Sequence, residues 1–594
     1  MTPRRVVLAM VSLAAAVAPV LAQTRPARPN AATAAFHALL DEDWQFRLRE
    51  FPESATLLGD DRYNDRLTDL SPEAIERRKA WARTALARVR RIDRNALEGQ
   101  DRISWDLFVF EKELEVDGQR YPSELMPLDQ INGPQLTFPA LIAQMPYATL
   151  RDYGNYLERL RAWPRYLEQV QALMEQGIAT GWVLPAVPLR TVPAQLVALI
   201  VDDASRSPLY QPVTRFPAGI APAARERIAR EAGAIIVGQI APAVARLKAF
   251  IETRYLPAGA GQTGASTLPD GAGWYAYSIR NYTTTSLGAK EIHELGLAEV
   301  ARIRAAMDSV IRASGFIGSF KEFLQFLRTD PRFYYRTADE LVTGYRDVAK
   351  RADAALPALF ATLPRLTYGV QPFPDFEAPA QTTARYFPGA ADGTRPGYFM
   401  VNTYKLESRP RYEMEALTLH EAVPGHHLQI ARAQELGELP EFRRNGGYNA
   451  FVEGWALYAE SLGPAMGMYQ DPYSKFGQLT YEMWRACRLV VDTGIHAFGW
   501  SRERAIQYML DNTAKSEQDV TVEVDRYIVW PGQALGYKLG ELRIKALRAR
   551  AEQALGDRFD LRRFHNAVLD NGPLPLDVLD RQMEDWIRSV RAAR

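Results

Sequence analysis

Residues 419–429 read LHEAVPGHHLQ and contain three of the seven histidines in the 594-residue chain, at positions 420, 426 and 427. Random placement rarely gathers three histidines within eight residues, and imidazole is the commonest metal ligand among side chains. The stretch begins like the zinc-binding pattern H-E-x-x-H, with His420 and Glu421, but Pro424 stands where the second histidine belongs. The sequence therefore predicts a metal site with altered histidine spacing.

The spacing between His420 and His426 decides which backbone this site needs. Positions i and i+4 of an α-helix share a face, whereas six residues correspond to a rotation of about 600°, which leaves His426 roughly 120° away from that face. Pro424 removes an amide hydrogen bond and disrupts the turn, and Gly425 permits conformations that other residues resist. We therefore predict a local bulge of two residues that returns His426 to the face of His420.

His427 is the alternative second ligand. It follows His420 by seven residues, which is about 10 Å along a straight helix. A single zinc ion with Zn–N distances of about 2.0–2.1 Å does not bridge that span unless the chain bends further. We favour His426, and we expect His427 to support the ligands from behind or to face the substrate.

A third ligand is expected from the segment FVEGWALYAE, residues 451–460. Glu453 follows His426 closely enough for an adjacent helix to return to the site. Aromatic and apolar neighbours such as Trp455 indicate a buried face, where a carboxylate needs a partner or a metal. An ordinary ion pair is the alternative interpretation of Glu453, and Glu460, about two turns further on, is the weaker candidate ligand.

The bulk composition excludes one class of function. The chain has 72 Lys and Arg against 71 Asp and Glu, a formal net charge of +1 and no basic block. Because binding to nucleic acid needs clustered Lys and Arg, we expect no nucleic-acid partner. The single cysteine, Cys487, permits no intramolecular disulfide, and its helical surroundings predict a small buried side chain.

The N-terminal residues 1–22 are predicted to be a secretory signal peptide. Arg4 and Arg5 precede a short apolar run that ends in small residues suited to cleavage. The run is too short to span a bilayer, and a buried N-terminal helix is the alternative interpretation. No cysteine follows the predicted cleavage site, so we expect no lipoprotein anchor, no integral membrane segment after cleavage, and a periplasmic or extracellular location.

Helical periodicity dominates the rest of the chain. The pair Ser71-Pro72, for example, is a helix start signal. We predict a mainly α fold, a large two-lobed helical body with a small β-ribbon beside the histidine helix. The strand of that ribbon is GYFMVNT, residues 397–403, which either forms an ordinary ribbon or pairs with a substrate backbone. The predicted divisions are an N-terminal helical half at 23–256, a Gly/Ala/Pro-rich loop at 257–275 and a helical catalytic half at 276–594.

Four motifs carry a family resemblance: TLHEAVPGHHLQ, FVEGWALYAE, RLVVDTGIH and RYIVWPGQALGYKLG. From about Ala35 onward, the chain resembles the bacterial family of domain-of-unknown-function 885 proteins. That family is similar to helical zinc peptidases of the gluzincin type, including carboxypeptidase Taq and the thimet oligopeptidases. The resemblance implies a zinc ion on His420, His426 and Glu453, with Glu421 as catalytic base. In carboxypeptidase Taq-like enzymes the histidines have the ordinary spacing, and this chain departs from it by two inserted residues.

Peptide hydrolysis at such a site needs further groups. Zinc with three protein ligands keeps a position for water, and Glu421 is expected to take its proton. The oxyanion needs a second electrophile, and a substrate carboxylate suits an arginine fork. The candidates are His496, Tyr527 and Tyr537 for the electrophile and Arg526 and Arg488 for the carboxylate. The alternatives are core positions for the two tyrosines and solvent-facing positions for the arginines.

These residues predict a secreted zinc peptidase acting on a peptide substrate. One alternative is a zinc-dependent amide hydrolase with a non-peptide substrate. Another is a non-catalytic helical binding protein with a vestigial metal site. Glu421 favours an enzyme, because a purely structural site has no use for a base beside its ligand.

Overall fold

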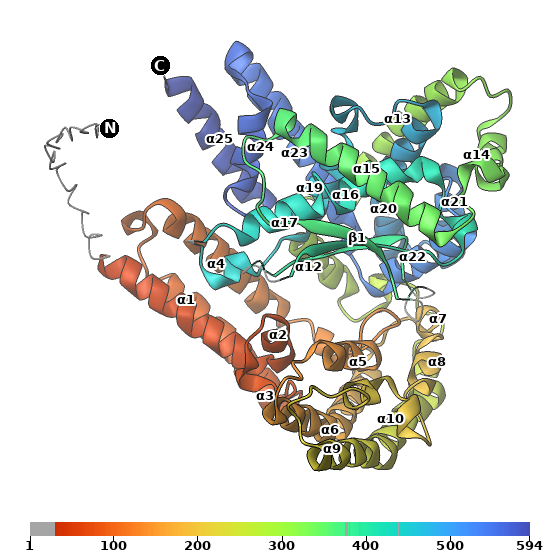
Figure 1. The fold of residues 1–594 in the computed structure, drawn as a ribbon. Helices are drawn as coiled ribbons and strands as arrows, with labels where there is room; N and C mark the ends of the chain where they lie inside the picture. Colours follow the sequence, from red (N-terminus) through yellow and green to blue (C-terminus); the bar gives the residue numbers. More distant parts are fainter. Residues whose placement is uncertain are drawn as a thin grey trace, which may run out of the picture.

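The computed structural model describes residues 30–374, 378, 381–390, 393, 395–437 and 439–593. Helices make up most of this part of the chain, and its β-structure is one small three-stranded sheet (Figure 1). The prediction of a mainly α fold is therefore confirmed. The predicted signal peptide, residues 1–22, and its cleavage site lie outside the described residues.

The first half of the chain is helical, and its helices start where the sequence offers caps. At the N-terminus of α3, the Ser71 side chain accepts a hydrogen bond from the Ala74 amide and Pro72 occupies the first turn, as predicted. The helices are α1 (Ala31–Glu50), α2 (Pro52–Leu57), α3 (Pro72–Val89), α4 (Gly99–Gly118), α5 (Pro134–Gln144), α6 (Leu150–Thr180), α7 (Ala186–Leu189), α8 (Val192–Val197), α9 (Pro222–Ile235), α10 (Ala241–Phe250) and α11 (Leu256–Ala258).

One helical stretch of the described chain, Pro222–Ala258, is long and apolar enough by composition to cross a membrane. It joins α9, α10 and α11 through two short π-helical segments. Half of its most apolar window is buried inside the protein, where the stretch packs against α6 and α8. This packing is typical of a core helix.

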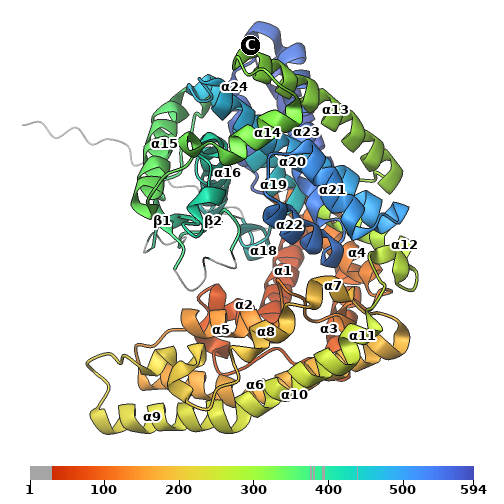
Figure 2. The ribbon, with the colours of Figure 1, turned by 90° about the vertical axis from the view of Figure 1, so that its right-hand side faces the viewer.

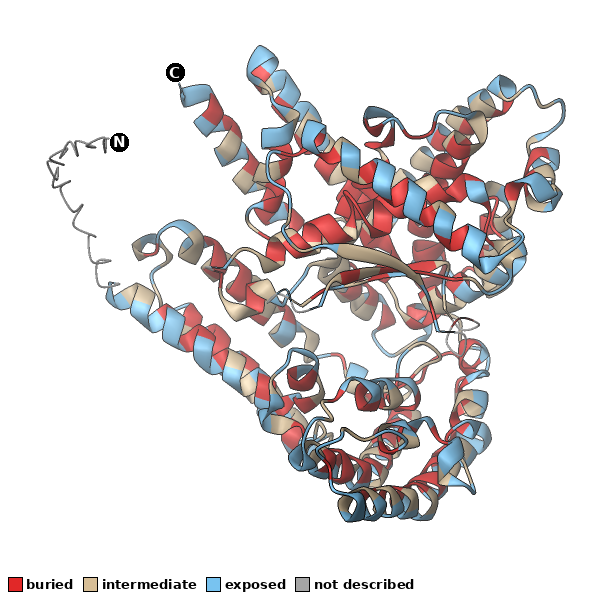
Figure 3. Cartoon of the chain, viewed as in Figure 1, coloured by how far each residue is buried: buried red, intermediate tan, exposed pale blue. Residues whose placement is uncertain are grey.

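The second half carries the predicted metal site. Its helices are α12 (Gly271–Thr283), α13 (Ala289–Ala313), α14 (Phe320–Thr329), α15 (Ala338–Leu359), α16 (Met414–Glu421), α17 (His426–Gln434), α18 (Glu441–Arg444), α19 (Asn449–Glu460), α20 (Pro472–Phe498), α21 (Arg502–Asn512), α22 (Glu517–Val529), α23 (Gly536–Leu555), α24 (Leu561–Leu569) and α25 (Leu576–Ala592). Buried residues concentrate where these helices meet, whereas the outer faces of α1 and α15 are exposed (Figure 3).

Helices α19 and α23 approach each other at two glycines. A Cβ atom on Gly454 would lie 2.4 Å from the Gly540 Cα atom, and one on Gly540 would lie 1.8 Å from the Ala450 carbonyl oxygen. Only glycine allows backbones to come this close. The contact brings the first turn of α23, which contains Tyr537, against the helix that carries Glu453.

The sheet contains β1 (Tyr368–Pro372), β2 (Ala384–Phe387) and β3 (Gly397–Val401) in the order β1-β3-β2. β3 is parallel to β1 and antiparallel to β2. The strand predicted at 397–403 is therefore present as the central strand, and both of its edges are already paired. It cannot receive a substrate strand. β2, which the sequence did not predict, is the edge strand that faces α16.

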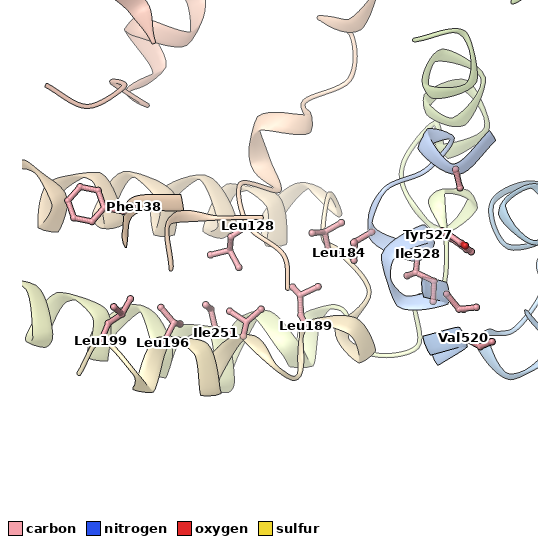
Figure 4. Close-up of a cluster of buried hydrophobic side chains, with 14 of the residues drawn as sticks. Leu128, Phe138, Leu184, Leu189, Leu196, Leu199, Ile251, Val520, Tyr527 and Ile528 are labelled. Carbon is pink, nitrogen blue, oxygen red and sulfur yellow. The ribbon is translucent and has the colours of Figure 1, made fainter. Parts of the chain in front are cut away.

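Helices α6, α9 and α10 of the first half form a layer apart from the body that contains α13 to α25 (Figure 2), whereas α1 and α4 share a hydrophobic cluster with that body. The predicted loop at 257–275 is only partly a loop, because α12 begins at Gly271. Two large hydrophobic clusters each contain residues of both halves. Leu184 and Leu189, around α7, meet Tyr527 and Ile528 of α22 where the layer joins the body (Figure 4).

Candidate metal centre

The histidine stretch folds as two helices separated by a break. α16 ends at Glu421 and α17 begins at His426, with a cis peptide bond between Val423 and Pro424. The break comprises residues 422–425, so the structure differs from the predicted two-residue bulge within one helix. Ala422 leaves helical geometry at φ −98° and ψ −108°, and its carbonyl oxygen accepts a hydrogen bond from the His427 amide at 3.1 Å.

Gly425 is required by the close approach of the chain to itself. A Cβ atom at this position would lie 1.9 Å from the carbonyl oxygen of His420 and 2.4 Å from that of Leu419. The break is also tied to the next helix, because the Trp455 indole nitrogen donates a hydrogen bond of 2.8 Å to the Pro424 carbonyl oxygen. Trp455 is fully buried, so α19 and the break hold a fixed relation to each other.

The break brings His420, His426 and Glu453 together, with one donor atom from each lying within 4.8 Å of the others. The Glu453 Oε2 atom lies 3.7 Å from His420 Nε2 and 3.5 Å from His426 Nε2. Two ligands bound to one zinc ion at about 2.0–2.1 Å in tetrahedral geometry lie roughly 3.3 Å apart. The donor separations of this triad thus suit an ion of that size.

An unsatisfied carboxylate oxygen also indicates a cation at this place. Glu453 Oε2 is buried and has no hydrogen-bond partner among the described residues. Buried polar groups in folded proteins are almost always paired, so an orphaned carboxylate oxygen between two imidazoles needs an explanation. Two imidazoles and one carboxylate are a donor set that zinc accepts. The residues present therefore fit a zinc ion.

Glu460 orients His420 rather than joining the triad. Its Oε1 atom accepts a hydrogen bond of 2.7 Å from His420 Nδ1, which leaves Nε2 to face Glu453. A carboxylate behind a ligand histidine fixes the ring and its tautomer. Burial by itself lowers the pKa of His420, but the neighbouring carboxylates of Glu453 and Glu460 outweigh it and raise that pKa to about 9. The site therefore has a negative field that favours a cation.

Glu421 lies beside the triad without belonging to it. Its Oε2 atom accepts a hydrogen bond of 2.8 Å from the Tyr386 backbone amide on β2. This bond fixes the carboxylate from the side of the sheet. Glu421 is buried and adjacent in sequence to His420, and it is not among the three residues whose donor atoms are grouped.

His427 points away from the triad and toward the sheet. Its Nδ1 atom shares a hydrogen bond of 2.8 Å with the Tyr386 hydroxyl, and its ring packs 4.6 Å from that of Tyr368. Burial lowers its pKa to about 4, so the ring is neutral at neutral pH. Of the two alternative second ligands, the structure groups His426 with His420 and Glu453.

Comparison with known proteins identifies the family of the chain. The model of a bacterial protein family of unknown function, DUF885, matches residues 52–583. The chain belongs to DUF885. A crystal structure titled as a putative lipoprotein from Colwellia psychrerythraea is similar, with 29% identity, a TM-score of 0.88, and coverage of 94% of this chain and 99% of that one. No match was found among curated proteins.

A second solved structure shares the fold. It is titled as a putative lipoprotein of unknown function from Shewanella oneidensis and is 19% identical, with a TM-score of 0.70. The match covers 93% of this chain and 99% of that one. The two solved structures thus share this helical architecture with the chain along nearly their whole length.

In this DUF885 chain, His496 is not brought to the triad. Its Nδ1 atom accepts a hydrogen bond of 2.9 Å from the Ala265 amide, and its Nε2 atom donates one of 2.9 Å to the Tyr527 carbonyl oxygen. It lies eleven residues along α20 from Arg485, which borders Glu460, a separation of roughly 16 Å. With both nitrogens bonded to backbone, the predicted role of His496 as an electrophile has no support here.

Tyr527 is likewise committed elsewhere. Its hydroxyl donates to Glu523 Oε2 at 2.7 Å and accepts from Arg488 Nε at 2.9 Å. Tyr537 is different, because it is only partly buried, and burial together with the nearby charge of Glu453 raises its pKa. Of the three predicted electrophiles, Tyr537 is the one whose pKa is affected by the charge of a triad residue, Glu453. Because that pKa is raised, the hydroxyl remains protonated at neutral pH.

Sequence reasoning missed two supports of the site. Tyr386 holds Glu421 through its backbone amide, and a backbone contact leaves no signature in the residue type. Glu460 was considered only as a ligand. Glu460 follows Glu453 by seven residues, which places both side chains on one face of α19. This spacing could have predicted that Glu460 lies close to the triad and supports a ligand.

Proposed function

We propose that this protein is a zinc-dependent peptidase. The observation that carries the proposal is the convergence of His420, His426 and Glu453, with the Glu421 carboxylate held beside them. When bound, zinc supplies Lewis acidity and lowers the pKa of a water molecule. The reaction class is hydrolysis of a peptide bond by that water.

The chain's own residues then divide the work. Glu421 accepts the proton of the attacking water and delivers it to the nitrogen of the leaving amine. The Tyr386 amide fixes one oxygen of Glu421 throughout. The Tyr537 hydroxyl donates a hydrogen bond to the carbonyl oxygen as negative charge develops there. Glu460 keeps the His420 ring in one orientation.

The proposed location is outside the cytoplasm. The predicted signal peptide supports it, and the two similar solved structures are titled as putative lipoproteins. A peptidase in that location acts on peptides of the envelope or the surroundings.

The proposal is tested by metal analysis and a peptide library. After zinc-replete expression we expect about one zinc ion per chain, because the donor set provides one site. The zinc-loaded protein should cut peptides in a mixed library, with cut positions read by mass spectrometry. A preparation that holds no transition metal contradicts the metal site. A zinc-loaded protein that cuts simple amides but no peptide supports a non-peptide amide hydrolase instead.

A further inference from the structure

A second cluster of buried charge lies next to the triad. We call it the arginine cluster, and it consists of Arg488 on α20 and Glu523, Arg526 and Tyr527 on α22. Both guanidinium groups bond to the same carboxylate oxygen, Glu523 Oε2, at 2.9 Å from Arg488 Nη2 and 3.0 Å from Arg526 Nη2. The Tyr527 hydroxyl donates to that oxygen as well.

The arginine cluster has a net charge of +1, because it contains two guanidinium groups and one carboxylate. Arginine stays protonated in proteins, so the two guanidinium groups face a single carboxylate. Arg488 is 5% exposed, and its Nη1 atom is buried without a hydrogen-bond partner among the described residues. An uncompensated charge in a protein interior is costly. The cluster is therefore built to receive an anion.

Another buried carboxylate, Asp492, follows Arg488 by four residues on α20, but it is hydrogen-bonded to the Tyr275 hydroxyl and the Gly532 amide. Arg485, one turn before Arg488 on α20, adds a further cation. Its nearest carboxylate, Glu460 at 3.7 Å, is already hydrogen-bonded to His420. The positive field thus extends from Arg488 toward the triad.

Two sets of contacts connect the arginine cluster to the triad. Arg526 Nη1 donates to Gln533 Oε1 at 2.5 Å, and Gln533 Nε2 donates to Asn449 Oδ1 at 3.0 Å. Asn449 precedes Glu453 by four residues on α19, so the two share a face and lie about 6 Å apart.

Tyr537 makes the second connection. Its ring lies 4.3 Å from the Arg488 Cζ atom and 6.0 Å from that of Arg485. The same side chain that faces Glu453 thus covers Arg488. Tyr537 is partly exposed and the Arg526 side chain is 14% exposed, so the cluster is approached along these two side chains.

We propose that the arginine cluster binds a carboxylate of the substrate and that this carboxylate is the free C-terminus of a peptide. The inference rests on the proposed peptidase function. In this arrangement the scissile bond lies at the triad and the terminal carboxylate lies at Arg526, with an extended peptide that spans about 3.3–3.6 Å per residue between them. The planar guanidinium of Arg526 contacts the carboxylate, and Arg488 supplies the buried charge behind it. The enzyme is then an exopeptidase that works from the C-terminus.

The test compares matched peptides with the zinc-loaded protein. One pair differs only in a free or amidated C-terminus, and a second, amidated pair has Glu or Gln as its last residue. We expect amidation to lower kcat/KM roughly ten- to hundredfold, the range of a hydrogen bond to a charged group. Arg526→Gln should reduce the acid-to-amide ratio toward one. Arg488→Lys, which keeps the charge, should reduce it less. The exposed Arg215→Gln is the matched control and should leave the ratio unchanged.

Each outcome bears on one of the two proposals. A preference for Glu over Gln in the amidated pair identifies a side-chain carboxylate as the source and still supports the carboxylate site. Equal rates for all four peptides overturn the carboxylate site and leave the proposed peptidase function intact.

If the zinc-loaded protein cuts no peptide, the proposed peptidase function is wrong. Saturation-transfer NMR with N-acetylphenylalanine and its amide then decides. Binding of the acid that is lost in Arg526→Gln supports the carboxylate site, and equal signals for acid and amide overturn it.

Discussion

At the scale of single residues, the proposed peptidase function gives Glu421 and its neighbours separable tasks. In that proposal His420 and His426 offer nitrogen atoms to the metal, whereas Glu421 is hydrogen-bonded to a backbone amide of β2 and contributes no donor atom to the triad. Substitution of a catalytic base and substitution of a metal ligand have different consequences. Loss of a base stops proton transfer, and loss of a ligand releases the metal.

The variant Glu421→Gln tests this separation. An amide keeps an oxygen that accepts the Tyr386 hydrogen bond, but it does not accept a proton from water. We expect kcat to fall by about 10²–10⁴, with zinc content unchanged by elemental analysis. Glu503→Gln, an exposed position on α21, is the control with parental activity. Retained activity, or loss of zinc, in Glu421→Gln shows that the role is assigned wrongly.

The two adjacent histidines provide the second residue-scale prediction. His426 faces Glu453, whereas His427 is bonded to Tyr386 on the sheet. His426→Ala should therefore weaken zinc binding much more than His427→Ala does, as measured by competition with a fluorescent chelator. If zinc is lost more readily from His427→Ala, the second ligand is His427 and the arrangement of the break is wrong.

The residues found from sequence are those whose side chains act within short, periodic motifs. His420 and Glu453 lie in helical segments whose apolar neighbours in sequence indicate a buried face. His496 was predicted as an electrophile because a lone histidine in a motif reads the same whether its nitrogens face substrate or backbone. Only the fold reveals that they bond to Ala265 and Tyr527. Contacts across dozens of residues, such as Tyr386 to Glu421, have no periodic signature.

At the scale of elements, the break between α16 and α17 is what makes the site. The sequence indicated that a regular helix fails, because proline and glycine separate the two histidines. It did not indicate that the helix ends altogether, since helix boundaries depend on tertiary partners. One such partner is Trp455, which bonds to the Pro424 carbonyl oxygen from α19.

Gly425→Ala tests the break directly. The added Cβ atom would meet the His420 carbonyl oxygen at 1.9 Å, so the backbone of the ligand itself must shift. Overpacking of this kind costs about 1–3 kcal/mol or more, and we expect a lower thermal midpoint together with weaker zinc binding. Gly437→Ala, just after α17, is the matched control because its Cβ atom would meet nothing within 4 Å. Equal behaviour of the two variants would falsify the proposed constraint.

At the scale of the whole molecule, buried side chains join elements that are distant in sequence. The arginine-bearing helix α22 packs against α7 of the first half, and two hydrophobic clusters extend across the predicted boundary. The sequence indicated two lobes from the Gly- and Ala-rich composition at 257–275. Local composition indicates a flexible segment, but it contains no information about which apolar faces pack together. The shared core could therefore not be predicted from it.

His565 shows how such a junction makes the stability of the molecule depend on pH. It is fully buried on α24, bonds to the Leu359 carbonyl oxygen at the end of α15, and shares a hydrogen bond with the Tyr458 hydroxyl of α19. Burial lowers its pKa from 6.5 to about 4. Between those values the unfolded chain binds a proton that the folded chain refuses, so this contribution to stability is present above pH 6.5 and is lost as the pH falls toward 4.

The expected size of this effect is on the order of 2 kcal/mol at pH 5, from the linkage between the two pKa values. Asp492 works in the opposite direction, because burial raises its pKa to about 7, so the pH profile of the parent protein alone does not isolate His565. The comparison of the parent with His565→Gln does. The variant is expected to be less stable at pH 7.5, because its packing is altered. Its free energy of unfolding in urea should fall less than that of the parent between pH 7.5 and pH 5. Parallel pH profiles for the two proteins would mean that His565 takes up its proton in the folded state, and that the junction of α15, α19 and α24 tolerates a charge.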